Sequence, residues 1–208
     1  EDEAVSLIFR PEDHTYWLDG RRLPGITRVL RDVGIGDLDV DDPVIAYAAE
    51  RGKAVHEATA LDDRGELDEA SVDPVVRPYL DAWRRFRGES GFRPIPSLIE
   101  VPLARSDLGF AGTPDRCGWL GQIPIVLEIK ATSQLHRRVG LQLGAQQMLA
   151  WTTEEFGAVV PNAIRRFSVR LCPDENPPYR LQEFKDPEDR NVFLAALRVE
   201  QWKRKEGA

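Results

Sequence analysis

Two acidic residues and a lysine near the middle of the chain have types and a spacing that suit metal-dependent chemistry. Asp115 follows Pro114 in the stretch GTPDRCGWL, and Glu128 and Lys130 end the apolar stretch IPIVLEIK. Carboxylates are the oxygen ligands that Mg²⁺ prefers in proteins. A cation bound there would lower the pKa of a coordinated water and neutralise charge building on a phosphodiester. A lysine beside it would stabilise that charge further.

The spacing of these residues also predicts how they are brought together. If residues 110–130 form a β-hairpin that turns at Gly121-Gln122, Asp115 falls directly opposite Glu128. Directly opposed β-carbons are about 4.5–5.5 Å apart, which lets two carboxylates hold one cation. Glu128 and Lys130 differ by two positions and therefore share one face of the strand. A simpler interpretation stays open, in which Asp115 is a turn acid and Glu128 and Lys130 are exposed.

The residues before this hairpin predict a second hairpin and three helices. In HTYWLDGRRLPG (14–25), the dipeptide Asp19-Gly20 is typical of a type I′ turn. A short helix over ITRVLRDVG would follow and end at Gly34. Two longer helices, each opened by an aspartate cap and a proline in the first turn, are expected at 41–61 and 73–90.

After these helices, short strands alternate with helical patterns. Strands are expected at 97–104, 108–120, 123–131, 165–172 and 179–185, and helices at 137–157 and 186–205. This order predicts an α/β (α+β) class, with a mixed central β-sheet flanked by helices. We expect one domain, residues 1–208, made of an N-terminal hairpin and helices (1–95), a catalytic core (96–172) and a C-terminal strand and helix (173–208).

Charge and composition argue against some classes of protein. The net charge of −7 argues against coating nucleic acid by bulk electrostatics. The stretch 129–153 nevertheless contains no acid and several cations, which leaves a local basic groove open. No apolar run approaches the roughly 20 residues of a membrane span, and no secretory signal is evident. With two cysteines, Cys117 and Cys172, a cytoplasmic setting without a membrane partner is expected.

Five short motifs, in order along the chain, resemble the PD-(D/E)XK nuclease superfamily, and in particular its RecB-like and phage-type exonuclease branch. They are Arg51-Gly52-Lys53-Ala54-Val55-His56-Glu57, Glu100 in LIEVPL, the turn GFAGTPDR, Glu128-Ile129-Lys130, and the helix carrying Gln142 and Gln146. The segment HTYWLDGRRLPGITRVL also resembles the opening of phage-type members. The resemblance implies a restriction-endonuclease-like core.

The resemblance implies a metal site built from several elements. Its catalytic residues would be Asp115, Glu128 and Lys130, and its metal ligands His56, Asp115, Glu128, the Ile129 carbonyl and, as a further candidate, Glu100. The cofactor would be Mg²⁺ or Mn²⁺. Two cysteines cannot hold the iron–sulfur cluster of some relatives, so no cluster is expected. A partly exposed helix histidine and an acid that ends a strand are the simpler interpretations of His56 and Glu100.

The resemblance also suggests residues that contact DNA. These are Gln142, Gln146, Arg137, Arg138, Arg51 and Lys53. Relatives usually have a tyrosine four residues after the glutamine, where this chain has Gln146, so the role of that position stays open. Two cations at a helix start are disfavoured by the helix dipole, which fits an anionic partner. Solvated side chains are the alternative for both the arginines and the glutamine.

Together these motifs imply a Mg²⁺- or Mn²⁺-dependent deoxyribonuclease, first of all an exonuclease on linear DNA ends in phage-type recombination or DNA processing. A structure-selective or nonspecific endonuclease is one alternative, and a non-catalytic DNA- or protein-binding module is another. The implied partners are DNA and a recombination or single-strand annealing protein, in a bacterial or phage-infected cell. The polarity, strand preference, number of metals and oligomeric state stay open.

Overall fold

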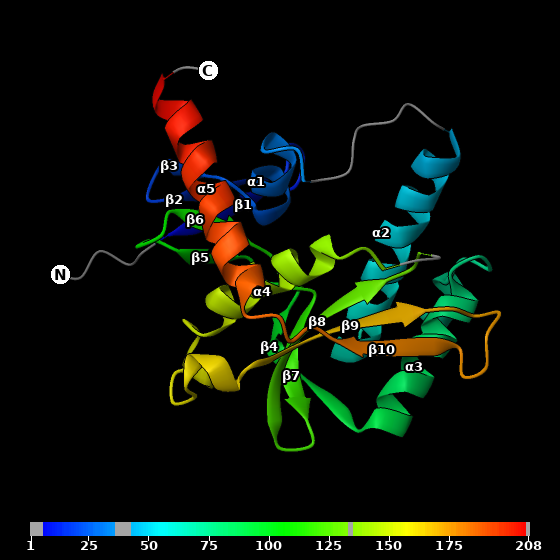
Figure 1. Ribbon diagram of the computed structural model, residues 1–208. Helices are drawn as coiled ribbons and strands as arrows, with labels where there is room; N and C mark the ends of the chain where they lie inside the picture. Colours follow the sequence, from blue (N-terminus) through cyan, green and yellow to red (C-terminus); the bar gives the residue numbers. More distant parts are fainter. Residues whose placement is uncertain (1–5, 36–42, 133–134, 207–208) are drawn as a thin grey trace.

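A five-stranded sheet forms the centre of the computed structural model, which describes residues 6–35, 43–132 and 135–206 (Figure 1). The strand order is β10-β9-β8-β7-β4. The strands are β4 (Phe92–Ile99), β7 (Arg116–Leu120), β8 (Ile123–Lys130), β9 (Arg165–Leu171) and β10 (Tyr179–Glu183). Strands β8 and β9 are parallel, whereas the other neighbours are antiparallel. The sheet is therefore mixed, as the sequence predicted.

Helices cover both faces of this sheet, so the fold is α/β. The helices α2 (Pro43–Arg64) and α3 (Arg77–Ser90) share one core cluster with Ile125, Leu127 and Ile129 of β8. The helix α4 (Arg138–Ala150) packs on the other face, in a cluster with Val126. A strand buried on both faces reads as a nearly continuous apolar run, which explains IPIVLEIK. Glu128 shares the face of Val126 and therefore points toward α4.

The N-terminal residues form a small three-stranded sheet followed by a short helix. Its strands are β1 (Leu7–Arg10), β2 (Thr15–Leu18) and β3 (Arg21–Leu23), and the helix is α1 (Ile26–Asp32). Asp19 and Gly20 have φ values of +48° and +75°, which confirms the predicted turn with two left-handed residues. Strand β1 was not predicted, and it pairs with β2 in an antiparallel ladder.

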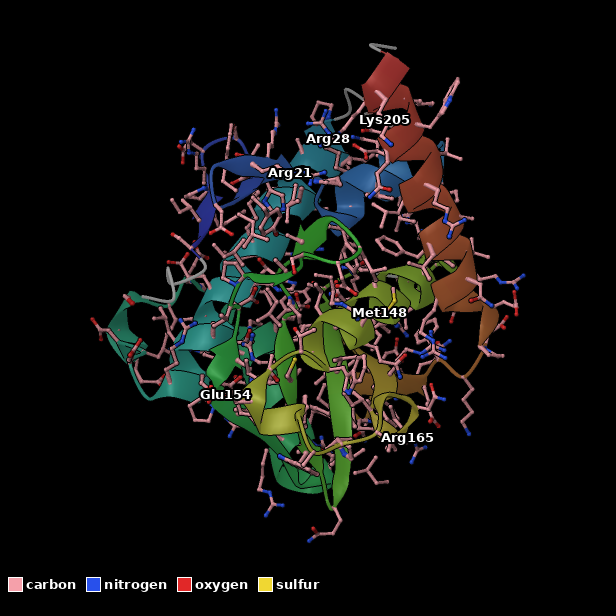
Figure 2. All side chains as sticks on the ribbon, turned by 90° about the vertical axis from the view of Figure 1, so that its left-hand side faces the viewer. Arg21, Arg28, Met148, Glu154, Arg165 and Lys205 are labelled. Carbon is pink, nitrogen blue, oxygen red and sulfur yellow. The ribbon has the colours of Figure 1, made fainter. Side chains whose placement is uncertain are left out.

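A third hydrophobic cluster joins α1 to the last helix of the chain. The helix α5 (Glu188–Glu206) packs on α1 and α4 through residues that include Phe193 and Leu197. The two-stranded ladder of β5 (Leu103–Arg105) and β6 (Phe110–Gly112) lies beside it. Lys203 donates from Nζ to the Asp32 carbonyl at 2.8 Å. Accordingly, Arg28 of α1 and Lys205 of α5 lie at the same end of the molecule (Figure 2).

Several predicted boundaries are wrong, because side chains end or delay the elements. Helix α4 ends at Ala150 rather than at 157, where the hydroxyls of Thr152 and Thr153 donate to carbonyls three residues earlier. Helix α3 begins at Arg77 rather than at 73, because Asp73 accepts the N–H of Val75 in a turn. These local hydrogen bonds compete with the helix.

Two further predicted boundaries concern the strand at 97–104 and the start of α2. The strand expected over 97–104 is two strands, β4 and β5, and β4 begins earlier than predicted, at Phe92. The predicted aspartate cap of α2 lies at residues 41–42, outside the described residues, and α2 is described from Pro43. The predicted cap of α5 is confirmed, because Asp186 accepts the N–H of Glu188 at 3.0 Å. Across the described residues, no helix is both long and apolar enough to cross a membrane.

Candidate metal centre

Three side chains from separate elements meet at one end of the sheet. His56 comes from α2, Glu100 follows β4, and Asp115 precedes β7. Their ligand atoms all lie within 4.8 Å of one another. The Nδ1 atom of His56 is 3.1 Å from Oε1 of Glu100 and 3.6 Å from Oδ1 of Asp115. One imidazole nitrogen and two carboxylate oxygens at this spacing fit a divalent cation.

Backbone contacts fix the two acids of this cluster. Glu100 has a φ of +51°, a left-handed conformation that costs a non-glycine residue on the order of 1–3 kcal/mol. In this conformation its N–H donates to the Asp115 carbonyl at 3.2 Å. The Asp115 carboxylate in turn accepts the N–H of Ile129 at 2.6 Å. The cluster is thus tied to the end of β8.

The register of β7 and β8 is the one that the sequence predicted. Arg116 pairs with Leu127, and Cys117 pairs with Val126. Continued by one residue, this register sets Asp115 opposite Glu128. The predicted hairpin turn at Gly121 is also present, with a φ of +65°.

The Glu128 carboxylate is held by three donors. Its Oε1 atom accepts from Lys130 Nζ at 2.6 Å and from Gln142 Nε2 at 2.7 Å. Its Oε2 atom accepts from Gln146 Nε2 at 2.7 Å. Because both of its oxygens already accept hydrogen bonds, Glu128 does not belong to the cluster of His56, Glu100 and Asp115. It stands next to that cluster as an anion with both oxygens bonded.

The electrostatics of the three-residue cluster favour bound protons. Burial and the negative charge of Glu128 raise the pKa of Asp115 to about 8. Burial alone would lower the pKa of His56, but the charge of Asp115 and the contact with Glu100 outweigh it and raise that pKa to about 9. Crowded carboxylates take up protons when no metal ion compensates their charge. A cation would displace those protons as it binds.

The pair of Glu128 and Lys130 has the opposite character. Burial opposes both charges, yet the ammonium of Lys130 lowers the pKa of Glu128. The charges of Glu128 and Asp115 overcome burial in the same way and raise the pKa of Lys130. Both groups are therefore ionised at neutral pH. Lys130 is consequently a fixed ammonium beside the cluster.

Arg116 is a component of the site that the sequence analysis missed. Its guanidinium is fully buried and donates to Asp63 Oδ2 at 2.6 Å and to Glu100 Oε1 at 3.2 Å. It also donates to the hydroxyl of Thr59 at 3.1 Å. Arg116 therefore ties Glu100 to the helix that carries His56. Its place directly after Asp115, in GTPDR, was the available signal.

The two predicted glutamines lie beside the lysine. Gln142 and Gln146 are one turn apart on α4 and both donate to Glu128. Gln146 is buried, and its Oε1 atom is without a hydrogen-bond partner in the described part of the chain. The structure therefore gives both residues a supporting contact to the acid.

The predicted basic residues of α2 make contacts within the protein. Arg51 donates to the Ala131 carbonyl at 3.2 Å and lies over the ring of Tyr79, 5.1 Å from its centre. Lys53 is exposed and pairs with Glu50 at 2.7 Å. Lys53 is therefore the more accessible of the two cations.

The two arginines at the start of α4 differ in their surroundings. Arg137 is 91% exposed and lies 3.4 Å from Asp186. The charge of Arg138 acts on Lys130, since it opposes the raised pKa of that ammonium. The charge of Arg138 thus reaches the site, whereas Arg137 faces solvent beside Asp186.

Comparisons with known proteins identify no family for this chain. No family model matches the chain, and no curated protein matches it. Among solved structures, the chain is similar to LHK-Exo, which was crystallised in complex with dAMP. The two are 15% identical with a TM-score of 0.36, and the match covers 89% of this chain and 93% of LHK-Exo. At this identity and TM-score, the likeness carries no information about activity.

Proposed function

We propose that this protein is a metal-dependent deoxyribonuclease of the PD-(D/E)XK type, which hydrolyses phosphodiester bonds in DNA with Mg²⁺ or Mn²⁺. The observation that carries the proposal is the juxtaposition of a cation-binding cluster and a fixed ammonium. His56, Glu100 and Asp115 lie within 4.8 Å of one another, next to the ion pair of Glu128 and Lys130. The order of the five sequence motifs supports the same assignment.

Each group at the site has a defined task in this proposal. A divalent cation, when bound, supplies an activated water and neutralises charge on the phosphate. His56, Glu100 and Asp115 would hold it, with the Ile129 carbonyl as a further oxygen ligand, whereas Glu128 would hold Lys130 beside it. These ligands are oriented before binding, since Asp115 accepts the Ile129 N–H and Glu100 accepts from Arg116.

Lys130 acts on the substrate rather than on the cation. Its ammonium is held by Glu128 at 2.6 Å, and Glu128 is held in turn by Gln142 and Gln146. A preorganised donor of this kind stabilises negative charge that builds on a phosphate in the transition state. The exposed cations Lys53 and Arg137 contact the DNA backbone in this proposal, along with Arg51 and Arg138.

Within the deoxyribonucleases, we assign the protein to the exonucleases that act on linear ends in phage-type recombination or DNA processing. The similarity of the motifs to the phage-type branch supports this narrower assignment. The corresponding partners are DNA and a recombination or single-strand annealing protein. A closed circle offers no end, so an exonuclease must spare it.

The test is cleavage of end-labelled linear DNA and of closed circular DNA, with Mg²⁺, Mn²⁺ or EDTA. Lys130→Ala should reduce the rate by about 10²–10³-fold, as the loss of one preorganised donor does. Lys185→Ala is the matched control, because Lys185 is 75% exposed and pairs with Glu183 on the edge strand. Nicking of the circle would indicate an endonuclease. Metal-indifferent DNA binding without any cleavage would indicate a binding module and overturn the proposal.

A further inference from the structure

A cavity opens directly beside the candidate metal centre. Its volume is about 640 Å³, within the range of roughly 300–1,000 Å³ that is typical of small-molecule sites. Glu100 and Asp115 form part of its wall. The N-terminal sheet supplies another part of the wall, through Phe9, His14 and Tyr16. Whatever occupies this cavity therefore lies next to the cation and against the hairpin.

The hairpin presents aromatic rings to this cavity. Phe9 and Tyr16 are directly opposed across β1 and β2, so both side chains lie on one face. Their ring centres are 4.8 Å apart. His14 joins them with its ring 5.1 Å from that of Phe9, and its φ of +52° belongs to a left-handed residue in the loop between the strands. The three rings form a continuous aromatic wall.

Only part of this wall is used by the protein itself. Tyr16 is buried, and its hydroxyl makes a hydrogen bond with Thr113 at 3.0 Å, two residues before Asp115. Phe9 is partly buried and His14 is exposed. Tyr16 therefore anchors the hairpin to the catalytic turn, whereas Phe9 and His14 retain ring surface for a ligand.

The charge of the lining argues for a base rather than a phosphate in this cavity. Among the described residues that line it, Lys53 is the one cation, and it is paired with Glu50. Glu100 and Asp115 are assigned to the cation at one end of the cavity, so the rest of the described lining offers no unpaired positive charge for a phosphate. Contact with the neighbouring rings partly desolvates His14 and lowers its pKa despite the nearby Asp13, so its ring is neutral at pH 7. Uncharged aromatic rings stack on the π-face of any base.

We propose that this cavity holds one unpaired nucleobase of the strand being cut, stacked on Phe9 and His14, with its phosphate at the metal centre. The inference rests on the proposed function and deepens it. A base cannot reach such a pocket while it is paired in a duplex. The substrate is therefore a single-stranded or frayed end, and the N-terminal hairpin selects it.

The test combines binding and cleavage in variants that keep the backbone intact. Phe9→Leu keeps an apolar side chain, and His14→Asn keeps a residue that tolerates a positive φ. The double variant F9L/H14N removes both rings. Trp17→Leu is the matched control, because Trp17 lies on the opposite face of the same hairpin, under Arg10.

Binding is followed with a single-stranded dodecamer that carries 2-aminopurine at both ends, in a Lys130→Ala background with Mn²⁺. We expect binding to quench the fluorescence, and F9L/H14N to remove the quenching and weaken binding roughly ten-fold or more. Trp17→Leu should leave both unchanged. If F9L/H14N showed the same quenching and affinity as the Lys130→Ala protein without these changes, the proposal of a base-binding pocket would be overturned.

Cleavage separates this inference from the proposed function. With Lys130 present, the protein should cut a single strand with terminal bases roughly ten-fold or more faster than the same strand with abasic ends. Equal rates would overturn the pocket and leave the nuclease assignment standing. Ring-dependent quenching without cleavage by the parent chain would overturn the nuclease assignment and keep the pocket.

Discussion

The two ends of one hairpin carry acids in opposite states, Asp115 just before β7 and Glu128 near the end of β8. Asp115 lies with His56 and Glu100, and burial together with the negative charge of Glu128 raises its pKa. Glu128, directly opposite, is bonded by Lys130 and two glutamines and has a lowered pKa. The fold therefore satisfies one acid completely and leaves the other for a cation. Glu128 therefore positions Lys130, whereas Asp115 is available to bind a metal ion.

The largest expected effect comes from removing the guanidinium that supports the cluster. Arg116→Ala leaves Asp63 buried beside Glu100 with one fewer partner, so the free energy of unfolding should fall by about 3–5 kcal/mol. Urea denaturation measures this loss. Arg84→Ala is the control, because Arg84 pairs with Asp62 nearer the surface and should cost less than about 1 kcal/mol. Similar losses in both variants would contradict the supporting role of Arg116.

A large effect of pH on metal affinity should follow from the protonated cluster. The pKa values of Asp115 and His56 are raised to about 8 and about 9, so this pair holds at least one proton at pH 7. Because these protons must leave before the ligands bind, Mn²⁺ affinity should rise with pH by about ten-fold per unit for each proton released. The rise should level off above about pH 9. Calorimetric titration at several pH values measures it, and a flat profile between pH 6 and 8 would contradict the account.

A smaller effect on metal affinity is expected from a change at Glu128, whose two oxygens already accept hydrogen bonds. Glu128→Gln removes the anion beside the cluster and releases Lys130. Mn²⁺ affinity should fall roughly 10–100-fold, the effect of losing a group that supports the first ligands. Asp115→Asn should lose more, because Asp115 belongs to the cluster itself. Equal losses of Mn²⁺ affinity in Glu128→Gln and Asp115→Asn, measured by the same titration, would show that the two acids do not differ in their role in metal binding.

The smallest effect is expected at the surface. Arg137→Ala removes a 91%-exposed cation, so DNA affinity should fall only a few-fold and the salt dependence of binding should decrease by about one ion. Lys185→Ala on the edge strand should change neither quantity. Binding measured over a range of salt concentrations tests this. An unchanged salt dependence in Arg137→Ala would remove Arg137 from the DNA interface.

Much of this arrangement could be predicted from local patterns. The apolar run IPIVLEIK and the turn at Gly121 were enough to set Asp115 opposite Glu128, as the register of β7 and β8 confirms. The aspartate and proline signals similarly predicted α5 from its first turn. Patterns of this kind depend on neighbours in sequence, although the same aspartate–proline signal placed the start of α3 four residues too early.

The remaining features depend on contacts between distant residues. Glu100 reaches His56 through a left-handed backbone at a strand end, where a continuous strand was expected. Arg116 follows Asp115 in sequence, but its role requires Asp63, 53 residues away, to be buried beside it. Strand β1 is different, because the turn residues Pro11 and Asp13 follow it and Phe9 packs against Tyr16 only seven residues away. That local signal was present in the sequence but was not used.

The most direct test of the central claim is the rate of DNA hydrolysis across a Mn²⁺ titration, in the parent chain and in Asp115→Asn. The parent rate should rise with Mn²⁺, saturate, and return to background with EDTA. Asp115→Asn should stay near background at every concentration, since it lacks a ligand of the cluster. Hydrolysis that is independent of metal, or an unchanged saturation curve in Asp115→Asn, would show that this cluster is not the metal site of the reaction.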